Sequence, residues 1–436
     1  MQFETPLGTI IGKTENKVIR IMGIPYGRAK RFEKPEEVDK LPTPFYANAP
    51  SVASPQISDP YFSRIFGHEV LEGLTIGEQC LNLSITRQET VSEQKKLPVM
   101  VWIHGGGYIS GCGDLVGTNP TQMVRENDVL VVSVSYRLGI LGFLGGYKNI
   151  PANLGLMDVI LALKWIKNNI EYFGGDSSNI TLFSQSAGGD LVAHLMAAQG
   201  VEGLFHKVII QSAPFGLRND KTEMINQMIK VGQEFDLNGS YEELMSIQSK
   251  MLEKAGGFGL KSGMPFGMQY GMAPLPNEGE VEHIWAERAS QFEVIVGYNR
   301  EETAVFLPLL EAVKKAMALP FVGNIAKAIV LKVTTGAIYK KGANAFYKDY
   351  KRAGGKIALY ELRFGSKTNG LKSTHTMELP LIFWDKEVWG KSELLKDIDK
   401  GYVEAFGKQI RKMWCDFAKE GYQAIPESFD SMIIKK

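Results

Sequence analysis

The 436-residue chain is predicted to fold as an α/β protein, with a mostly parallel central sheet covered by helices on both faces. Short, continuous apolar segments alternate along the chain with segments of helical periodicity, which is typical of repeated strand–helix units. Strands that are buried on both faces are apolar throughout. The charges nearly cancel, with 49 Lys and Arg against 48 Asp and Glu, and this balance excludes the basic surface of a dedicated nucleic-acid binder.

Six apolar segments are the predicted strands of this sheet. They are residues 99–103, 129–134, 180–183, 208–210, 292–296 and 357–362. Three further segments have apolar residues at helical spacing and are predicted helices: residues 156–170, 187–198 and 400–419. Asn153 precedes the first of these helices and is its predicted N-cap.

The whole chain, residues 1–436, is predicted to form a single domain. Residues 1–95 are rich in proline and contain short strand-like pieces, which predicts a small antiparallel edge with long loops. Residues 218–290 and 303–350 are helical and irregular, and we expect them to form a cap over one end of the sheet. No segment has the roughly 18 apolar residues of a membrane span, and no signal-peptide pattern is seen, so a cytoplasmic location is expected.

Residues 179–190 contain the strongest candidate for a nucleophile. An apolar strand leads into Ser186, and a helix that starts with small residues follows. This layout is that of a nucleophile elbow, whose tight turn tolerates only small flanking side chains. Ser184 occupies the first glycine position of the usual GxSxG pattern. Taken alone, the SxSxG pattern here is more often a serine that caps an ordinary helix.

A glycine-rich segment upstream favours the catalytic interpretation. His104-Gly-Gly-Gly107 follows an apolar strand. Acyl transfer passes through an oxyanion, which rigid backbone N–H groups stabilise, and glycines let the backbone approach the oxygen closely. His-Gly-Gly-Gly at this point is the lipase and esterase form of such a loop. The alternative is a phosphate-binding loop, but the Lys-Ser/Thr pair of that loop is missing.

An alcohol nucleophile also needs a base and an orienting carboxylate, which follow the serine in the order acid, then histidine, in this fold. Of the six histidines, only His375 comes after the last predicted strands. The loop after the strand that ends at Val296 offers two acids, Glu301 and Glu302. Both residues are glutamates, so their chemistry alone does not indicate which one is the orienting carboxylate.

Motifs along nearly the whole chain resemble the type-B carboxylesterases, the α/β-hydrolases that include cholinesterases and bacterial nitrobenzyl-type esterases. These motifs are residues 23–26, 31–32, 77–83, 102–107, 135–143, 153–158, 168–170, 173–177, 184–189, 297–302, 375–383 and 414–421. The resemblance implies an α/β-hydrolase fold and a Ser186–Glu302–His375 triad. It places the acid at Glu302, because the acid of the family follows one acidic residue in that loop.

The resemblance also implies an oxyanion hole formed by the N–H groups of Gly106, Gly107 and Ala187, and chemistry that needs no metal or cofactor. Besides Ser184, two positions depart from the family pattern. Gln185 replaces the glutamate that usually precedes the nucleophile, which lowers the expectation of cationic substrates. Cys80 lacks its usual disulfide partner, since the expected position falls near Ser54.

Some matched residues are predicted to be structural. Arg31, Glu78, Arg137 and Asp158 are expected to form buried ion pairs that hold loops in place, without a catalytic role. Cys112 is expected to be a buried, unreactive thiol.

Together these features predict a serine carboxylesterase that hydrolyses small to medium uncharged esters through an acyl-enzyme intermediate. Residues 264–266 and 306–321 are expected to shape its pocket. The partner is a small-molecule ester, no nucleic acid or membrane span is expected, and the oligomeric state is left open. The alternatives are a lipase with an amphipathic lid at residues 316–331, an amidase that uses the same triad, and a non-catalytic binding module.

Overall fold

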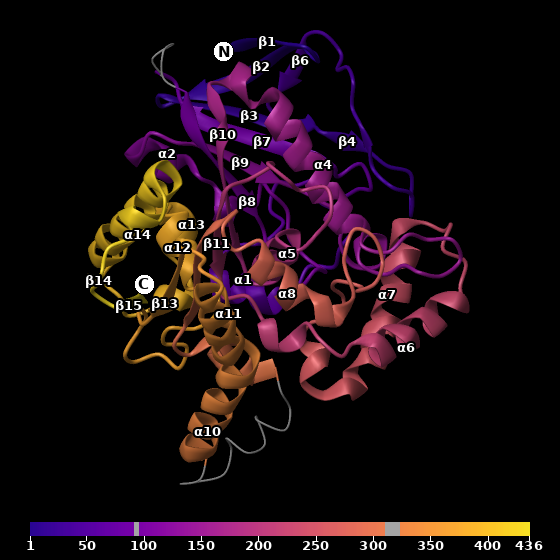
Figure 1. The fold of residues 1–436 in the computed structure, drawn as a ribbon, viewed down its shortest axis with the longest axis vertical. Helices are drawn as coiled ribbons and strands as arrows, with labels where there is room; N and C mark the ends of the chain where they lie inside the picture. Colours follow the sequence, from indigo (N-terminus) through magenta and orange to yellow (C-terminus); the bar gives the residue numbers. More distant parts are fainter. Residues whose placement is uncertain (91–95, 310–322) are drawn as a thin grey trace.

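The sheet at the centre of the computed structural model contains 13 strands within the described residues, which are 1–90, 96–309 and 323–436. The strands follow the order β1-β2-β3-β7-β9-β8-β10-β11-β12-β13-β15-β14, with β6 paired to β2 (Figure 1). Their bounds are β1 (Gln2–Thr5), β2 (Gly8–Glu15), β3 (Val18–Pro25), β6 (Phe45–Ala47), β7 (Asn82–Gln88), β8 (Leu97–Ile103), β9 (Leu130–Val134), β10 (Gly175–Gln185), β11 (Lys207–Gln211), β12 (Glu293–Asn299), β13 (Ile357–Leu362), β14 (Ser428–Phe429) and β15 (Met432–Lys435). A separate pair joins β4 (Gly27–Arg28) to β5 (Glu36–Glu37).

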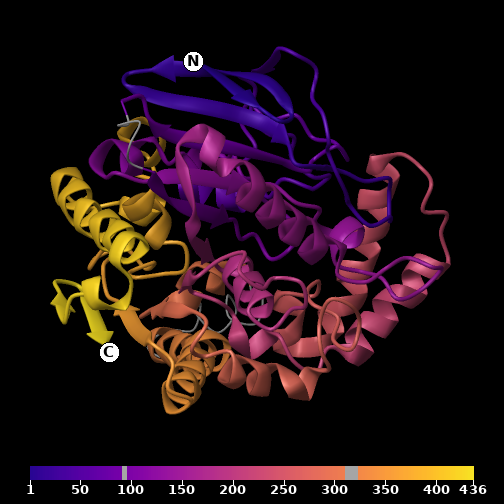
Figure 2. The ribbon, with the colours of Figure 1, turned by 45° about the horizontal axis from the view of Figure 1, so that its top comes forward.

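The six central strands, from β9 to β13 in the sheet, are all parallel to one another. They coincide with the six predicted strands, so the predicted α/β fold is confirmed. The N-terminal strands β1, β2, β3 and β7 pair antiparallel, as expected for the first part of the chain (Figure 2). The antiparallel β15 and β14 close the other edge, and the sequence analysis did not predict them.

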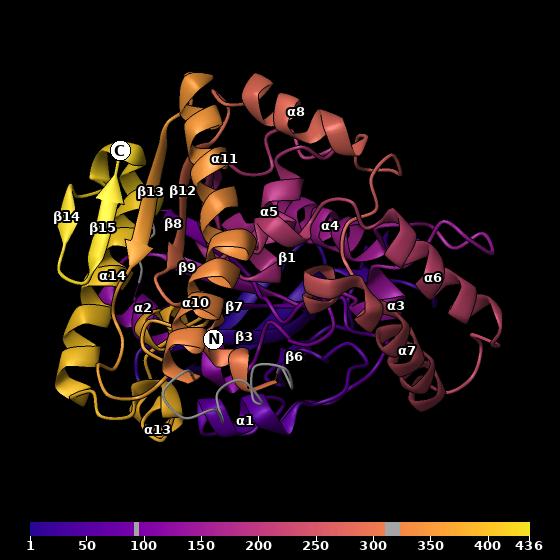
Figure 3. The same ribbon diagram turned by 90° about the horizontal axis from the view of Figure 1, so that it is seen from below.

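Helices cover both faces of the sheet. Figure 3 shows α14 on one side of the central strands, with α11 and α5 on the other. The bounds of the helices are α1 (Pro60–Phe66), α2 (Thr121–Glu126), α3 (Gly139–Gly142), α4 (Leu154–Asn169), α5 (Ala187–Leu195), α6 (Thr222–Gln233), α7 (Tyr241–Ala255), α8 (Val281–Glu287), α10 (Gly323–Thr335), α11 (Lys341–Arg352), α12 (Glu378–Ile382), α13 (Lys386–Trp389) and α14 (Lys400–Glu420). The three predicted helices correspond to α4, α5 and α14.

Two apolar cores lie on opposite faces of the sheet. Successive side chains of a strand point to opposite faces. Along β8, Val99, Val101 and Ile103 belong to the core beneath α4 and α5, whereas Met100 and Trp102 belong to the core beneath α14. This alternation explains why the strand is apolar at every position.

The segments predicted to form a cap are helical. Residues 218–290 contain α6, α7 and α8, and residues 303–350 contain α10 and α11, which are joined by a π-helical turn, η8 (Gly336–Lys340). Figure 1 shows α10 projecting from the body of the molecule. The prediction of an amphipathic lid at residues 316–331 lies partly outside the described residues, and its described part, from Gly323 onward, is α10.

The predicted structural residues form the expected ion pairs, but only the Arg137–Asp158 pair is buried, since Arg31 and Glu78 are partly exposed. The Arg31 Nε lies 2.9 Å from Glu78 Oε2, and the buried Arg137 Nε lies 2.8 Å from Asp158 Oδ2. Cys112 is a free cysteine whose burial, as predicted, raises the pKa of its thiol to about 12.

Asn153 is the N-cap residue of α4, as predicted, but its side chain makes no capping hydrogen bond. Its backbone is left-handed, with a φ of 60°, and its side-chain amide donates to the carbonyl oxygen of Gln269 at 2.9 Å instead of capping α4. The side chain therefore joins two distant loops.

None of the helices in the described residues combines the length and apolarity needed to cross a bilayer.

Candidate active site

Ser186 lies in a sharp turn between the end of β10 and the first residue of α5. Its backbone has a φ of 58° and a ψ of −128°, a conformation that costs about 1–3 kcal/mol for a residue with a side chain and persists only where the surroundings enforce it. The Ser186 N–H donates to the carbonyl oxygen of Gln211 at 2.8 Å. A Cβ atom at Gly188 would overlap the carbonyl oxygen of Ile103, so the start of α5 packs directly on the strand next to it.

Ser184 fits the position where the usual motif has glycine. It is fully buried, and its hydroxyl donates to the carbonyl oxygen of Ile209 at 3.0 Å. A satisfied hydroxyl costs little on burial, so the departure from GxSxG leaves the turn intact.

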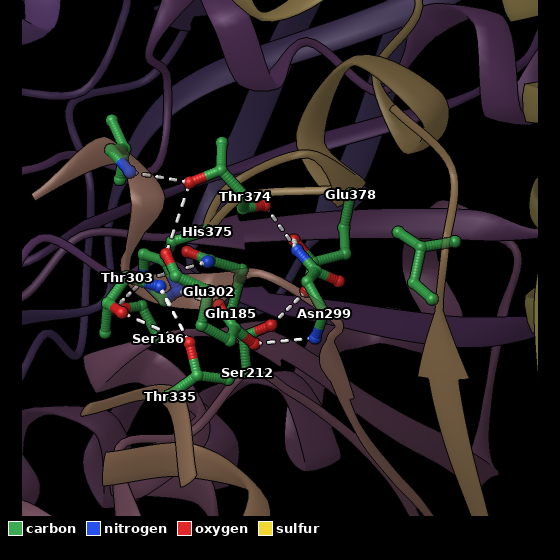
Figure 4. Close-up of polar contacts among 12 residues, drawn as sticks. Gln185, Ser186, Ser212, Asn299, Glu302, Thr303, Thr335, Thr374, His375 and Glu378 are labelled. Atoms are coloured by element: carbon green, nitrogen blue, oxygen red, sulfur yellow. Dashed lines mark hydrogen bonds and ion pairs between the residues drawn. The ribbon is translucent and has the colours of Figure 1, made fainter. Parts of the chain in front are cut away.

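Three predicted site residues form one hydrogen-bonded chain (Figure 4). The His375 Nε2 lies 2.8 Å from Ser186 Oγ, and the His375 Nδ1 lies 2.6 Å from Glu302 Oε2. His375 and Glu302 are buried, whereas Ser186 is partly exposed to the pocket. The arrangement leaves the histidine with its Nδ1 toward a carboxylate and its Nε2 toward a hydroxyl, as a general base requires.

Backbone contacts fix the loop of the acid relative to the loop of the histidine. Glu302 begins the short helix η6 (Glu302–Val305), and its carbonyl oxygen accepts from the His375 N–H at 3.0 Å. Its second carboxylate oxygen accepts from the Asn299 N–H at 2.7 Å. Glu301 points elsewhere, with its carboxylate 3.4 Å from Arg300. Of the two adjacent acids, Glu302 is therefore the one that contacts His375.

The glycine loop after β8 lies beside Ser186. Gly106 has a φ of 108°, and a Cβ atom there would overlap the carbonyl oxygen of Ser110. In the described part of the chain, the N–H groups of Gly106, Gly107 and Ala187 have no hydrogen-bond acceptor. These donors are free to bind an oxygen atom of a substrate.

His104, the first residue of that loop, belongs to its framework. Its ring stacks on Tyr136 with the ring centres 4.4 Å apart, and its Nδ1 lies 2.8 Å from the carbonyl oxygen of Gly105. Burial lowers the pKa of His104 to about 4, so the ring is neutral at ordinary pH.

A cavity of about 290 Å³ opens over Ser186 and His375. Most of its lining is apolar. Its side chains include Ile57, Phe62, Phe66, Val70, Leu71, Trp102, Ile109, Leu115, Pro214, Leu217, Met264, Pro265, Phe306, Tyr339 and Leu379. Met264, Pro265 and Phe306 come from the segments predicted to shape the pocket, whereas the predicted positions 310–321 lie outside the described residues. Among the described lining residues, Asp59 is the one with a charged carboxylate, and none is lysine or arginine.

Sequence reasoning missed the contacts of two polar residues beside the Ser186–His375–Glu302 chain. The Gln185 Nε2 lies 3.2 Å from His375 Nε2, although the sequence analysis treated Gln185 only as a lost carboxylate. Glu378 is buried behind the acid, where it accepts from Asn299 Nδ2 at 2.7 Å and from the hydroxyl of Ser212. Its position three residues after His375, just before an apolar run, was the available signal.

Glu378 has an unusual environment for an acid. Burial, together with the nearby Glu302 carboxylate, raises the pKa of Glu378 to about 7. Ser212 and Asn299, which donate hydrogen bonds to its carboxylate oxygens, are also fully buried. The structure thus contains two adjacent buried acids of which Glu302 alone contacts His375.

The described residues contain no group of three or more His, Cys, Asp or Glu side chains arranged to hold a metal ion.

Comparison with known proteins identifies the family. The model of the carboxylesterase family matches residues 1–319. The chain belongs to the carboxylesterase family. The probable N-octanoylanthranilate hydrolase of Rhodococcus erythropolis is 30% identical over 95% of this chain and 92% of its own length. The para-nitrobenzyl esterase of Bacillus subtilis is 28% identical over 96% of this chain and 89% of its own length.

The solved structure of a thermophilic pNB esterase has the same fold. It superposes with a TM-score of 0.76 and 27% identity, covering 96% of this chain and 91% of that structure. These similarities confirm the α/β-hydrolase fold and the activity of a serine carboxylesterase, which hydrolyses carboxylic esters.

Proposed function

We propose that Ser186 is the nucleophile, His375 the general base and acid, and Glu302 the orienting carboxylate of this carboxylesterase. The hydrogen-bonded chain from Ser186 Oγ through His375 to Glu302, at 2.8 and 2.6 Å, supports these roles. The unpaired N–H groups of Gly106, Gly107 and Ala187 beside Ser186 support a role as the oxyanion hole.

The reaction has two halves. In the first, Ser186 Oγ attacks the ester carbonyl carbon while His375 Nε2 takes its proton, and the carbonyl oxygen becomes an oxyanion held by the three N–H groups. His375 then gives the proton to the leaving alcohol as the ester C–O bond breaks. In the second half, water attacks the acyl-enzyme by the same route and releases the acid. Glu302 stabilises the charged imidazole at both stages.

The substrates that we propose are small to medium uncharged esters. The cavity of about 290 Å³ is at the small end of ligand pockets, and its lining is apolar. A lining without lysine or arginine among the described residues offers no partner for an anionic substrate. In a series of p-nitrophenyl esters, kcat/KM is expected to be highest for two- to six-carbon acyl chains. Preference for chains beyond about twelve carbons would contradict this substrate class.

The test of the triad compares hydrolysis of p-nitrophenyl acetate and butyrate by the wild type and by Ser186→Ala. Loss of the nucleophile is expected to lower kcat at least about 1,000-fold. Ser184→Ala is the matched control, because it removes a buried hydroxyl two residues away and should keep kcat within about threefold. Equal activity of the wild type and Ser186→Ala would refute the proposal.

Amide hydrolysis is a second candidate activity, since one relative is named as a hydrolase of an N-acyl amide. The p-nitroanilide with the same acyl group as the best ester tests it. Cleavage that is abolished in Ser186→Ala would support an amidase activity of the same triad, and no cleavage would leave the ester activity alone.

The helical segments 218–290 and 303–350 are proposed to act as the cap of a single catalytic domain, supported by the presence of Leu217, Met264, Phe306 and Tyr339 in or beside them on the pocket wall. The cytoplasmic location stays a prediction.

A further inference from the structure

Tyr108 directly follows the glycines of the oxyanion loop and is anchored beneath them. Its backbone is left-handed, with a φ of 63°, which is costly for a bulky residue. The side chain is fully buried, and its ring lies 4.4 Å from the ring of Phe143. Its carbonyl oxygen accepts from the Gly139 N–H at 2.6 Å. Such a strained residue keeps its conformation only if its contacts enforce it.

The phenol of Tyr108 reaches across to the helix that carries the third oxyanion donor. Its hydroxyl donates to Asp190 Oδ2 at 2.7 Å. Asp190 is in the first turn of α5, and its N–H donates to the carbonyl oxygen of Ser186 at 3.1 Å. One hydrogen bond between side chains thus connects the loop of Gly106 and Gly107 to the turn of Ser186 and Ala187.

Asp190 is itself held in place. It is 1% exposed, and its backbone carbonyl oxygen lies 2.7 Å from Nδ1 of His194, one helical turn further along α5. The other ring nitrogen of His194 lies 2.8 Å from the hydroxyl of Tyr270. Lys221 is also buried, and the negative charge of Asp190 favours the charged form of its ammonium group. These contacts hold the backbone of Asp190, while its Oδ1 has no hydrogen-bond partner, so the Tyr108 hydroxyl is the one hydrogen-bond donor to this carboxylate among the described residues.

We infer that the hydrogen bond between Tyr108 and Asp190 sets the spacing between the two segments that form the oxyanion hole. Tyr108 and Asp190 are therefore positioning residues for the ester hydrolysis. This inference rests on the proposed function, because it concerns the N–H groups of Gly106, Gly107 and Ala187. The donors stabilise an oxyanion only when they lie about 3 Å from its position, so a loosened loop weakens the transition state more than substrate binding.

Tyr108→Phe tests the inference, because it removes one oxygen atom and keeps the buried ring. We expect kcat for p-nitrophenyl acetate to fall about tenfold while KM stays within twofold. Complete loss of one oxyanion donor costs about 100- to 1,000-fold, and a displaced loop should cost less. Tyr350→Phe is the matched control, since its buried hydroxyl donates to the carbonyl oxygen of Phe292 at 2.9 Å, away from the pocket. It should leave kcat unchanged.

A transition-state analogue separates positioning from general stability. Ser186 Oγ adds to the carbonyl carbon of a trifluoromethyl ketone, its proton passes to His375, and the ketone oxygen becomes an oxyanion. In Tyr108→Phe the affinity for this ketone should fall about as much as kcat, whereas the affinity for the unreactive alcohol of the same shape should not change. Wild-type values for kcat and for the ketone in Tyr108→Phe would overturn the inference.

Substitutions of Asp190 test the hydrogen bond from its other end, and they replace Tyr108→Phe should that variant fail to fold. Asp190→Asn keeps an acceptor for the Tyr108 hydroxyl and should retain kcat within about threefold, whereas Asp190→Ala should lose about tenfold. Equal losses in both would assign the effect to the charge and overturn the inference. If Ser186→Ala is as active as the wild type, the proposed function fails instead, whatever Tyr108→Phe does.

Discussion

Replacing Glu302 by glutamine tests the orientation of His375 with almost no change in shape. Both carboxylate oxygens of Glu302 accept hydrogen bonds, one from the Asn299 N–H at 2.7 Å and one from His375 Nδ1 at 2.6 Å. A glutamine has one acceptor oxygen and one donating amide group. Whichever way the amide turns, its NH₂ group faces a donor.

The cheapest relief of this conflict is a change of tautomer. A buried donor without a partner costs about 1–3 kcal/mol. His375 avoids this cost by moving its proton to Nε2, so that Nδ1 accepts from the amide. The Nε2 then has no lone pair for the Ser186 hydroxyl at 2.8 Å and is no longer a base. By analogy with other triads, we expect kcat to fall about 1,000- to 10,000-fold, which is about 4–5.5 kcal/mol of transition-state stabilisation.

The assay is steady-state hydrolysis of p-nitrophenyl butyrate by Glu302→Gln and Glu301→Gln. The second variant is the matched control, because Glu301 has the same chemistry one residue earlier but contacts Arg300. It should keep kcat within twofold. KM should change little in both variants, since neither residue lines the pocket. A Glu302→Gln enzyme with more than a tenth of wild-type kcat, or an equal loss in Glu301→Gln, would refute the reasoning.

Two further predictions concern the polar residues around the triad. Gln185→Glu puts a carboxylate within hydrogen-bond distance of His375 and favours the charged imidazole. The acidic limb of the profile of kcat/KM against pH should therefore move to higher pH by about one unit. An unchanged acidic limb would contradict this prediction. The pKa of Glu378 is raised to about 7 by burial and by Glu302, so the folded state binds a proton that the unfolded chain loses, and stability falls as pH rises. In urea titrations, the free energy of unfolding of the wild type should fall by about 2–3 kcal/mol between pH 5 and pH 8 relative to that of Glu378→Gln. The same pH dependence in both proteins would disprove this prediction.

The core of the fold could be predicted because its signal is local. Each parallel strand is buried on both faces, and that burial requires continuous apolar runs such as residues 99–103. The elbow was also visible, because a turn that forces Ser186 to a φ of 58° needs small residues next to it. The antiparallel strands β14 and β15 are short and half-exposed, and so they carry no comparable pattern.

Other features depend on contacts between residues far apart in the sequence. The choice between Glu301 and Glu302 is made by the turn into η6, which directs one side chain to His375 and the other to Arg300. The contact of Glu378 with Asn299 joins α12 to the end of β12, and the position of Glu378 three residues after His375 did not by itself identify that partner. The position of Asn153 at the start of α4 was predicted, but its side-chain contact was not, because its amide binds a loop more than a hundred residues away.

The most direct test of the account is to locate the residue that a fluorophosphonate modifies. Its phosphorus is attacked by an activated serine, which displaces fluoride and leaves a stable adduct. Digestion and peptide mass spectrometry of the fully inhibited enzyme should find one adduct, on Ser186, and the Ser186→Ala protein should remain unmodified. An adduct on a different residue, or inhibition of esterase activity without any adduct on Ser186, would contradict the account.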